Sequence, residues 1–186
     1  MIHSFPLRQA ARALACCLLL CSATSLAFAQ RSENQVGLFG PLKPPASAVA
    51  VQFPKAPQEA ALEKVSVTGG STMGFLVDLS SISVASDTEV RYVLVAQSAQ
   101  GVRNVSYEGL DCAQNAWHVY GVWSAGGQRW VRNPQTDWIA VNVGGFTRIH
   151  GVLASDYLCE NGRAAGSAET IVENLKEGLH GPQPTP

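Results

Sequence analysis

The chain contains 186 residues, of which 46% are hydrophobic and 15% are charged, and its formal net charge is −1. This composition is typical of a globular protein and disfavours a disordered or collagen-like chain. It also disfavours general nucleic-acid binding, because no excess of lysine and arginine is present to neutralise phosphates.

Residues 1–29 have the pattern of a secretory signal peptide. Arg8 and Arg12 form a positive N-terminal region, residues 13–21 are continuously apolar, and a small-x-small motif ends at Ala29. We expect cleavage between Ala29 and Gln30. The apolar run is shorter than the ~20 residues needed to span a bilayer, so the mature form is expected to have no transmembrane helix.

Three cysteines inside this leader allow an alternative, a lipid-modified N-terminus. Lipoprotein processing favours a small residue just before the cysteine and an aliphatic residue three positions before it. None of the three cysteines fits: Cys16 has Ala13 at the aliphatic position, Cys17 follows Cys16, and Cys21 follows the bulky Leu20. We therefore expect a periplasmic or extracellular protein after cleavage. An outer-membrane lipoprotein is the less favoured alternative.

Cys112 and Cys159 are the two cysteines that remain after cleavage. An even pair in an exported chain predicts a disulfide, because the compartment is oxidising. A catalytic thiol and a zinc site are the competing interpretations. They are disfavoured because neither cysteine lies in a CxxC motif and no histidine has finger-like spacing.

The mature chain divides into three parts by composition. Residues 30–60 are proline-rich and are predicted to be a flexible tether. Residues 61–180 hold the candidate core of a single domain. Residues 181–186 are expected to be a disordered tail.

Strand patterns follow one another at short intervals within this domain. The segment at 89–96 is apolar on both faces, which predicts a central strand. Residues 125–128 form a turn pattern between two strands. Such short connections leave no room for helical crossovers, so we predict an antiparallel meander of about five to seven strands. The segments are 65–67, 73–78, 89–96, 103–108, 117–123 and 129–131.

The last third of the domain changes to a helical period. Phe146, Ile149, Leu153 and Tyr157 share one helical face. A second helix is predicted to start at a Ser167 cap and to stop at residues 180–182. The predicted fold class is therefore α+β, with one antiparallel sheet and two helices toward the C-terminus.

The chemistry-bearing residues form no recognised catalytic motif. His118, His150 and His180 are dispersed, which is typical of surface or capping histidines, so no metal and no cofactor is expected. Nucleophile and phosphate-binding motifs are absent from the sequence. Glu108 and Asp111 are the carboxylates on which an alternative function, a small periplasmic hydrolase, would depend.

Four tryptophans lie close together in the sequence, at 117, 123, 130 and 138. Their large apolar area favours a core role, with a recognition surface as the alternative. Trp117 and Trp123 are six residues apart, which places them on the same side of a strand if no bulge intervenes. The candidate binding surface comprises Trp123, Arg129, Trp130 and Arg132.

Several motifs resemble those of the cryptic neisserial protein one-like family of exported proteins. They are Phe75-Leu76-Val77-Asp78, the run from Val90 to Val95, the run from Asn104 to Cys112, Trp138-Ile139 and the run from Leu153 to Cys159. The segment ending at Cys112 is the most specific of them. The resemblance covers residues 60–175, and Leu158 departs from it where the family often has an aromatic residue.

The resemblance implies an envelope location and a Cys112–Cys159 pairing, but no reaction. The strand order and cysteines are similar, more distantly, to surface-adhesin protein E-like domains, which bind host extracellular proteins. The sequence thus predicts an exported, non-enzymatic envelope protein that binds an envelope or extracellular protein or a small ligand. A carboxylate hydrolase and a lipid-anchored accessory protein are the alternatives.

Overall fold

The computed structural model describes residues 50–67, 72–86, 88–135, 137–141 and 148–178. The predicted signal peptide, its cleavage site between Ala29 and Gln30, most of the tether and the C-terminal tail lie outside these residues. Phe146 and His180 lie outside them as well.

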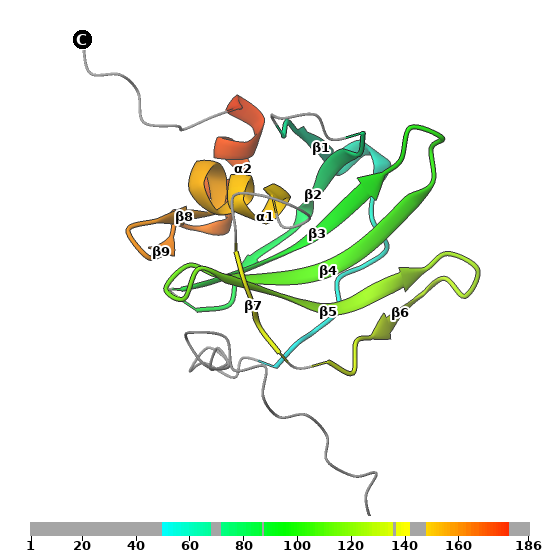
Figure 1. The fold of residues 1–186 in the computed structure, drawn as a ribbon, viewed down its shortest axis with the longest axis horizontal. Helices are drawn as coiled ribbons and strands as arrows, with labels where there is room; N and C mark the ends of the chain where they lie inside the picture. Colours follow the sequence, from blue (N-terminus) through cyan, green and yellow to red (C-terminus); the bar gives the residue numbers. More distant parts are fainter. Residues whose placement is uncertain (1–49, 68–71, 87, 136, 142–147, 179–186) are drawn as a thin grey trace, which may run out of the picture. The chain divides into compact units, whose positions relative to one another are not determined.

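The central feature is an antiparallel sheet whose first six strands follow one another in space in chain order, from β1 to β6. A short seventh strand, β7, pairs with β5 beside β6. The predicted meander is confirmed (Figure 1). Its strands are β1 (Leu62–Val65), β2 (Gly74–Val84), β3 (Glu89–Gln97), β4 (Arg103–Asp111), β5 (Ala116–Ser124), β6 (Arg129–Arg132) and β7 (Ile139–Ala140).

Strand β3 lies inside the sheet, as its apolar run predicts. All side chains from Glu89 to Val95 are buried, because both faces of the sheet are covered at this strand. Strand β2 is longer than predicted and has an irregularity between Asp78 and Ser83. There the Ser81 hydroxyl accepts a hydrogen bond from the backbone N–H of Val93 at 2.8 Å, which replaces a regular ladder contact.

Two helical segments cover one face of the sheet (Figure 1). The first is α1 (Arg148–Leu153), which continues directly into a π-helical turn, η3 (Ala154–Leu158). The second is α2 (Ala168–Glu177). Among the described residues, no helix is both long enough and apolar enough to cross a bilayer. The core between helices and sheet comprises Val65, Val77, Ile82, Val90, Tyr92, Leu94, Leu110, Cys112, Ile149, Leu153, Ala154, Tyr157, Leu158, Ile171 and Leu175.

Helix α2 begins where the sequence predicts and ends earlier. The Ser167 side chain accepts a hydrogen bond from the backbone N–H of Thr170 at 3.3 Å, which confirms the predicted cap. The expected stop at residues 180–182 is wrong. The helix ends at Glu177 because Gly178 adopts a left-handed conformation with φ of 63°, a common helix C-terminus.

Cys112 and Cys159 form a disulfide with their Cα atoms 5.5 Å apart. Cys112 directly follows β4, and Cys159 starts a small hairpin of β8 (Cys159–Glu160) and β9 (Arg163–Ala164) that the sequence did not predict. The bond ties the end of the π-helical turn to the C-terminal end of the inner strand β4.

Residues 50–58, which we call the strap, lie along the sheet face opposite to α1 and α2 (Figure 1). They were expected to belong to a flexible tether. Instead, the Phe53 ring packs on strands β4, β5 and β6, and the backbone N–H of Gln58 donates to the Asp78 carboxylate at 3.2 Å. A short 3₁₀ turn, η1 (Glu59–Ala61), then leads into β1. Proline content alone missed this packing because the contacts join distant parts of the sequence.

Candidate functional site

An aromatic cluster occupies the sheet face that the strap crosses, and we call it the aromatic face. Neighbouring ring centroids lie 4.8–6.4 Å apart, within the usual range for aromatic pairs. The rings come from the strap, from β4 to β6 and from the residues before β7. They belong to Phe53, Tyr107, His118, Tyr120, Trp123, Trp130 and Trp138.

A β-bulge in strand β5 determines which tryptophans join this face. Tyr107 pairs with Gly121 while the next residue, Glu108, pairs with Val119, so Tyr120 is an extra residue in β5. The extra residue reverses the alternation of side chains beyond it. Trp117 therefore faces the helices and Trp123 faces the strap. The expectation that Trp117 and Trp123 share one side is wrong, and its stated condition, an unbroken strand, is not met.

A buried ion pair lies beneath the aromatic rings. The Arg91 guanidinium donates to both carboxylate oxygens of Glu89, at 2.6 and 3.2 Å, and the Tyr120 hydroxyl donates to the same carboxylate at 2.5 Å. The guanidinium carbon also lies 5.0 Å from the centre of the Tyr120 ring. Such a charge pair is tolerated in a core only when its hydrogen bonds are satisfied. The arrangement fixes the Tyr120 ring in place.

Burial and the Glu89 carboxylate also shift the pKa values of Tyr120 and Arg91. Burial, followed by the hydrogen bond to Glu89, raises the pKa of the Tyr120 phenol well above its usual value. Burial opposes the charge on Arg91, but the hydrogen bond and charge of Glu89 outweigh it and raise the pKa of the guanidinium. Tyr120 is thus held as a neutral donor and Arg91 as a cation.

Three of the four residues of the predicted binding surface meet on the aromatic face. Trp123 and Trp130 are register partners with their ring centroids 5.4 Å apart, and Arg132 lies on the same side. Arg129 is exposed on the other side of β6, next to Val131. Val131 and its register partner Val122 are both exposed.

The strap is seated on this surface through Phe53. Its ring stacks on Trp130 at 5.8 Å, and the Arg132 guanidinium carbon lies 5.0 Å from the ring centre. A Cβ atom at Gly121 would come within 2.6 Å of the Phe53 ring, so only glycine allows this approach. The indole N–H of Trp130 donates to the Pro54 carbonyl oxygen at 2.8 Å. Sequence reasoning identified Trp130 and Arg132 but not the segment that they hold.

The two carboxylates proposed for hydrolysis point to opposite sides of the sheet. Glu108 faces the helices, where it accepts from Ser106 at 2.6 Å and lies 2.9 Å from the Nε2 atom of His150. Asp111 faces the other way and accepts from the backbone N–H groups of Ala113 and Gln114 in the following turn. The two do not form a carboxylate pair, and each already has structural partners.

The histidines were expected at the surface, and for two of them this is wrong. His150 is buried, and its ring stacks on Trp117 with centroids 3.7 Å apart. His118 is buried against Trp138, with its Nδ1 atom 2.9 Å from the carbonyl oxygen of Asp137. Contacts between distant parts of the chain bury both histidines, and the spacing of the histidines in the sequence does not reveal these contacts. In the described part of the chain, no three His, Cys, Asp or Glu side chains are placed to hold a metal.

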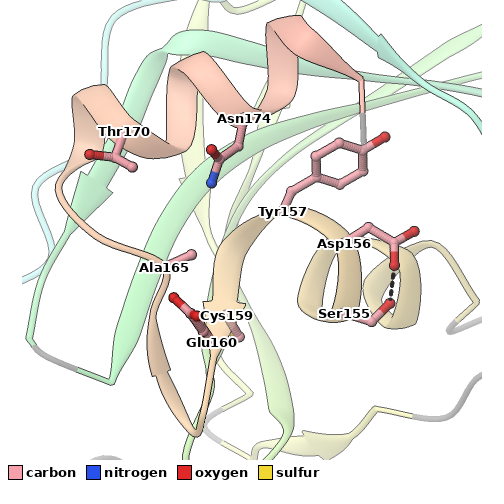
Figure 2. A pocket seen from close by; sticks show the side chains of 8 residues that line it. All are labelled: Ser155, Asp156, Tyr157, Cys159, Glu160, Ala165, Thr170 and Asn174. Atoms are coloured by element: carbon pink, nitrogen blue, oxygen red, sulfur yellow. Dashed lines mark hydrogen bonds between the residues drawn. The ribbon is translucent and has the colours of Figure 1, made fainter. Parts of the chain in front are cut away.

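A polar hollow of about 350 Å³ lies beside the disulfide, between the π-helical turn, β8 and α2 (Figure 2). In it, the Ser155 hydroxyl donates to the Asp156 carboxylate at 2.6 Å. The lining residues are Ser155, Asp156, Tyr157, Cys159, Glu160, Ala165, Thr170 and Asn174. None of the residues predicted for the binding surface lies here.

A model of the CNP1-like family matches residues 43–176. The chain belongs to the CNP1-like family. It is also 28% identical, over 131 residues, to cryptic neisserial protein 1 of Neisseria gonorrhoeae. That alignment covers 63% of this chain and 64% of the relative, so it spans less than two thirds of the relative's length. No solved structure matches the chain.

Membership in the CNP1-like family confirms the resemblance that the sequence motifs indicated. The matched region runs from residue 43 to residue 176, so it includes the whole strap, the sheet, α1 and all of α2 except its last residue. Neither the family name nor the relative's name states an activity, a ligand or a compartment. Function therefore has to be argued from the aromatic face and its surroundings.

Proposed function

We propose that this CNP1-like protein is exported to the cell envelope and acts there as a non-enzymatic module that binds another envelope or extracellular protein. The export part is supported by the leader, with Arg8 and Arg12 before an apolar run and a small-x-small motif ending at Ala29. The Cys112–Cys159 bond supports it too, because disulfides persist in oxidising compartments.

The binding part is supported mainly by the β5–β6 hairpin. It carries half-buried Trp123 and Trp130 with exposed Arg132 on one side, and exposed Val122 and Val131 on the other. Tryptophan and arginine are the residue types most enriched at binding hot spots. Strand β6 also ends the β1-to-β6 strand order, so its outer edge has no partner strand within that order. An exposed sheet edge can take up an extended partner segment as an added strand.

The hydrolase alternative receives no such support. Glu108 and Asp111 point to opposite faces and both accept hydrogen bonds from neighbouring groups. A general acid–base pair needs two groups that reach one substrate atom, and this geometry keeps them apart. We therefore do not propose hydrolysis.

Site-specific crosslinking in intact cells tests the proposal. A photo-crosslinking amino acid is placed at Arg129 on the hairpin and, as a control, at Lys176 on α2, both of which are exposed. We expect a discrete crosslinked product from position 129 and none from position 176. Equal labelling at the two positions, in a protein that is folded and exported, would refute binding through the hairpin.

The mass of the purified protein tests export and processing in the same experiment. We expect a chain that starts at Gln30 and carries no added mass. A heavier, detergent-soluble N-terminus would instead support the lipid-anchored alternative. A chain that keeps residues 1–29 would contradict the export proposal.

A further inference from the structure

The contacts of the strap form a compact seat for one aromatic–proline pair. We call it the Phe53 seat and define it as Tyr107, Gly121, Trp130 and Arg132. Phe53 lies 5.9 Å from the Tyr107 ring and 5.8 Å from the Trp130 ring, and it lies directly on the backbone at Gly121. The seat combines stacking, a cation over the ring and a glycine that leaves room.

The Phe53 seat also has a hydrogen-bond donor for the peptide backbone. The Trp130 indole N–H donates to the carbonyl oxygen of Pro54, the residue that follows the seated ring. Proline fixes its own backbone and restricts the residue before it to an extended conformation. Aromatic surfaces recognise extended proline-containing segments because little conformational entropy is lost when such a segment binds.

The strap is held by the Phe53 ring and by hydrogen bonds between its backbone and side chains of the sheet: the Ala50 and Pro54 carbonyls accept from Arg91 and Trp130, and the Gln58 N–H donates to Asp78. It forms no strand pairing with the sheet, and Phe53 and Pro54 are only half-buried. A partly buried segment without strand pairing opens locally at lower cost than a paired strand of the sheet. The strap can therefore leave the Phe53 seat while the sheet stays folded.

The charges indicate that the strap is not the best ligand for its own seat. Pro54 is followed by exposed Lys55, a cation, and the charged residue of the seat itself, Arg132, is also a cation, with its guanidinium carbon 5.0 Å from the centre of the Phe53 ring. A segment with an acidic residue at the Lys55 position would complement the charge of Arg132.

We propose that the Phe53 seat is a recognition site for an extended segment of a partner protein that has an aromatic–proline pair followed by an acidic residue. The strap occupies this site in cis and competes with that partner. The inference rests on the proposed function, because it assigns the partner's chemistry to the same β5–β6 hairpin. A competing internal segment lowers the apparent affinity for the partner by the fraction of molecules whose seat is empty.

Peptide titration of the purified, exported protein tests this site. The probe is a synthetic peptide with the sequence of residues 50–58, in its natural form and with Lys55→Glu, and binding is followed by calorimetry. We expect Phe53→Ala protein to bind the Lys55→Glu peptide at least about tenfold more tightly than wild-type protein, because the variant empties the seat. We also expect the Lys55→Glu peptide to bind more tightly than the natural one, with a difference that shrinks at high salt.

Two further variants distinguish specific binding at the Phe53 seat from non-specific peptide binding. Trp130→Phe, added to Phe53→Ala, keeps a ring but removes the N–H, and we expect it to weaken binding about fivefold to tenfold. Trp117→Phe is the matched control and should leave affinity unchanged, because Trp117 faces the helices on the other side of the sheet, where it stacks on His150. If Phe53→Ala lowers the content of folded protein, Phe53→Leu replaces it and the same order of affinities is expected.

The inference is overturned if the emptied seat binds the peptide no better than wild type, or if Trp130→Phe has no effect. Its failure can be distinguished from failure of the proposed function. Peptide binding without a crosslink at position 129 leaves the seat intact and refutes partner binding through the hairpin in cells. A crosslink without peptide binding keeps the envelope role and refutes the seat.

Discussion

Breaking the Cys112–Cys159 bond is predicted to lower the free energy of unfolding by about 4 kcal/mol. The two cysteines are 47 residues apart, and closing a loop of that size removes entropy worth about 4 kcal/mol from the unfolded chain. Cys112 is 8% exposed within the core and Cys159 is half-buried. Reduction changes no other covalent bond and, unlike a substitution, keeps the side chains at both positions. Reduction of the wild-type protein therefore isolates the effect of the crosslink.

The expected loss is large compared with the ~5–15 kcal/mol that stabilises a typical domain. For a domain of this size, each kcal/mol shifts the thermal midpoint by about 3–5 °C, so a fall of about 12–20 °C is expected. Urea unfolding followed by tryptophan fluorescence, with and without reductant, measures the free energy directly. Thiol titration shows when reduction is complete.

A matched pair of variants provides the control for reagent effects. Cys112→Ala with Cys159→Ala should be as unstable as the reduced wild type, and reductant should not destabilise this variant further. Each single Cys→Ser variant should show one free thiol and a lower midpoint. A fully reduced wild-type protein with less than about 1 kcal/mol of change would refute the loop-entropy argument.

The remaining predictions concern packing, a buried histidine–carboxylate contact and pH. Gly109→Ala should cost about 1–3 kcal/mol, because its Cβ would lie 2.8 Å from the Tyr120 ring, whereas Gly126→Ala, with nothing within 4 Å, should be neutral in the same urea titration. His150→Leu should cost about 1–3 kcal/mol because it removes the His150 contact of the buried Glu108 carboxylate and leaves Ser106 as its donor, and adding Glu108→Gln should recover part of that loss in a double-mutant cycle. The pKa values of all four tyrosines are raised, chiefly by burial, so the folded chain holds protons that the unfolded chain loses near pH 10. The contribution of the tyrosines to the free energy of unfolding should therefore be fully present below pH 10 and be lost as the pH rises above it. Tyrosine ionisation is followed by absorbance at 295 nm, and a rise near pH 10 in the folded protein would contradict this prediction.

Alternation and capping predicted the elements that depend on neighbouring residues alone. The apolar run at 89–96 became the buried strand β3, and Ser167 caps α2 as expected. Ile149, Leu153 and Tyr157 share one buried face although a π-helical turn follows α1. These patterns are local, so the printed sequence contains the information they need.

The candidate site was predicted only in part. Trp123, Trp130 and Arg132 were identified from composition, and they lie together on the aromatic face. Phe53 was missed because its partners lie far away along the chain, and proline content pointed to a tether. One signal was available: a phenylalanine before a proline is an unusual choice for a segment that contacts nothing.

The sequence by itself determined the strand order, the start of the last helix, the two cysteines available for a disulfide and the membership of a family. Only the tertiary structure decided which way the tryptophans face, where the histidines lie and what the strap does. One extra residue at Tyr120 reverses the alternation in β5, and no local pattern marks it. His150 is buried against Glu108, and Phe53 packs against Gly121, only because distant chain segments meet on folding. Side-chain packing acts through space and not along the chain, so the sequence alone does not show these contacts.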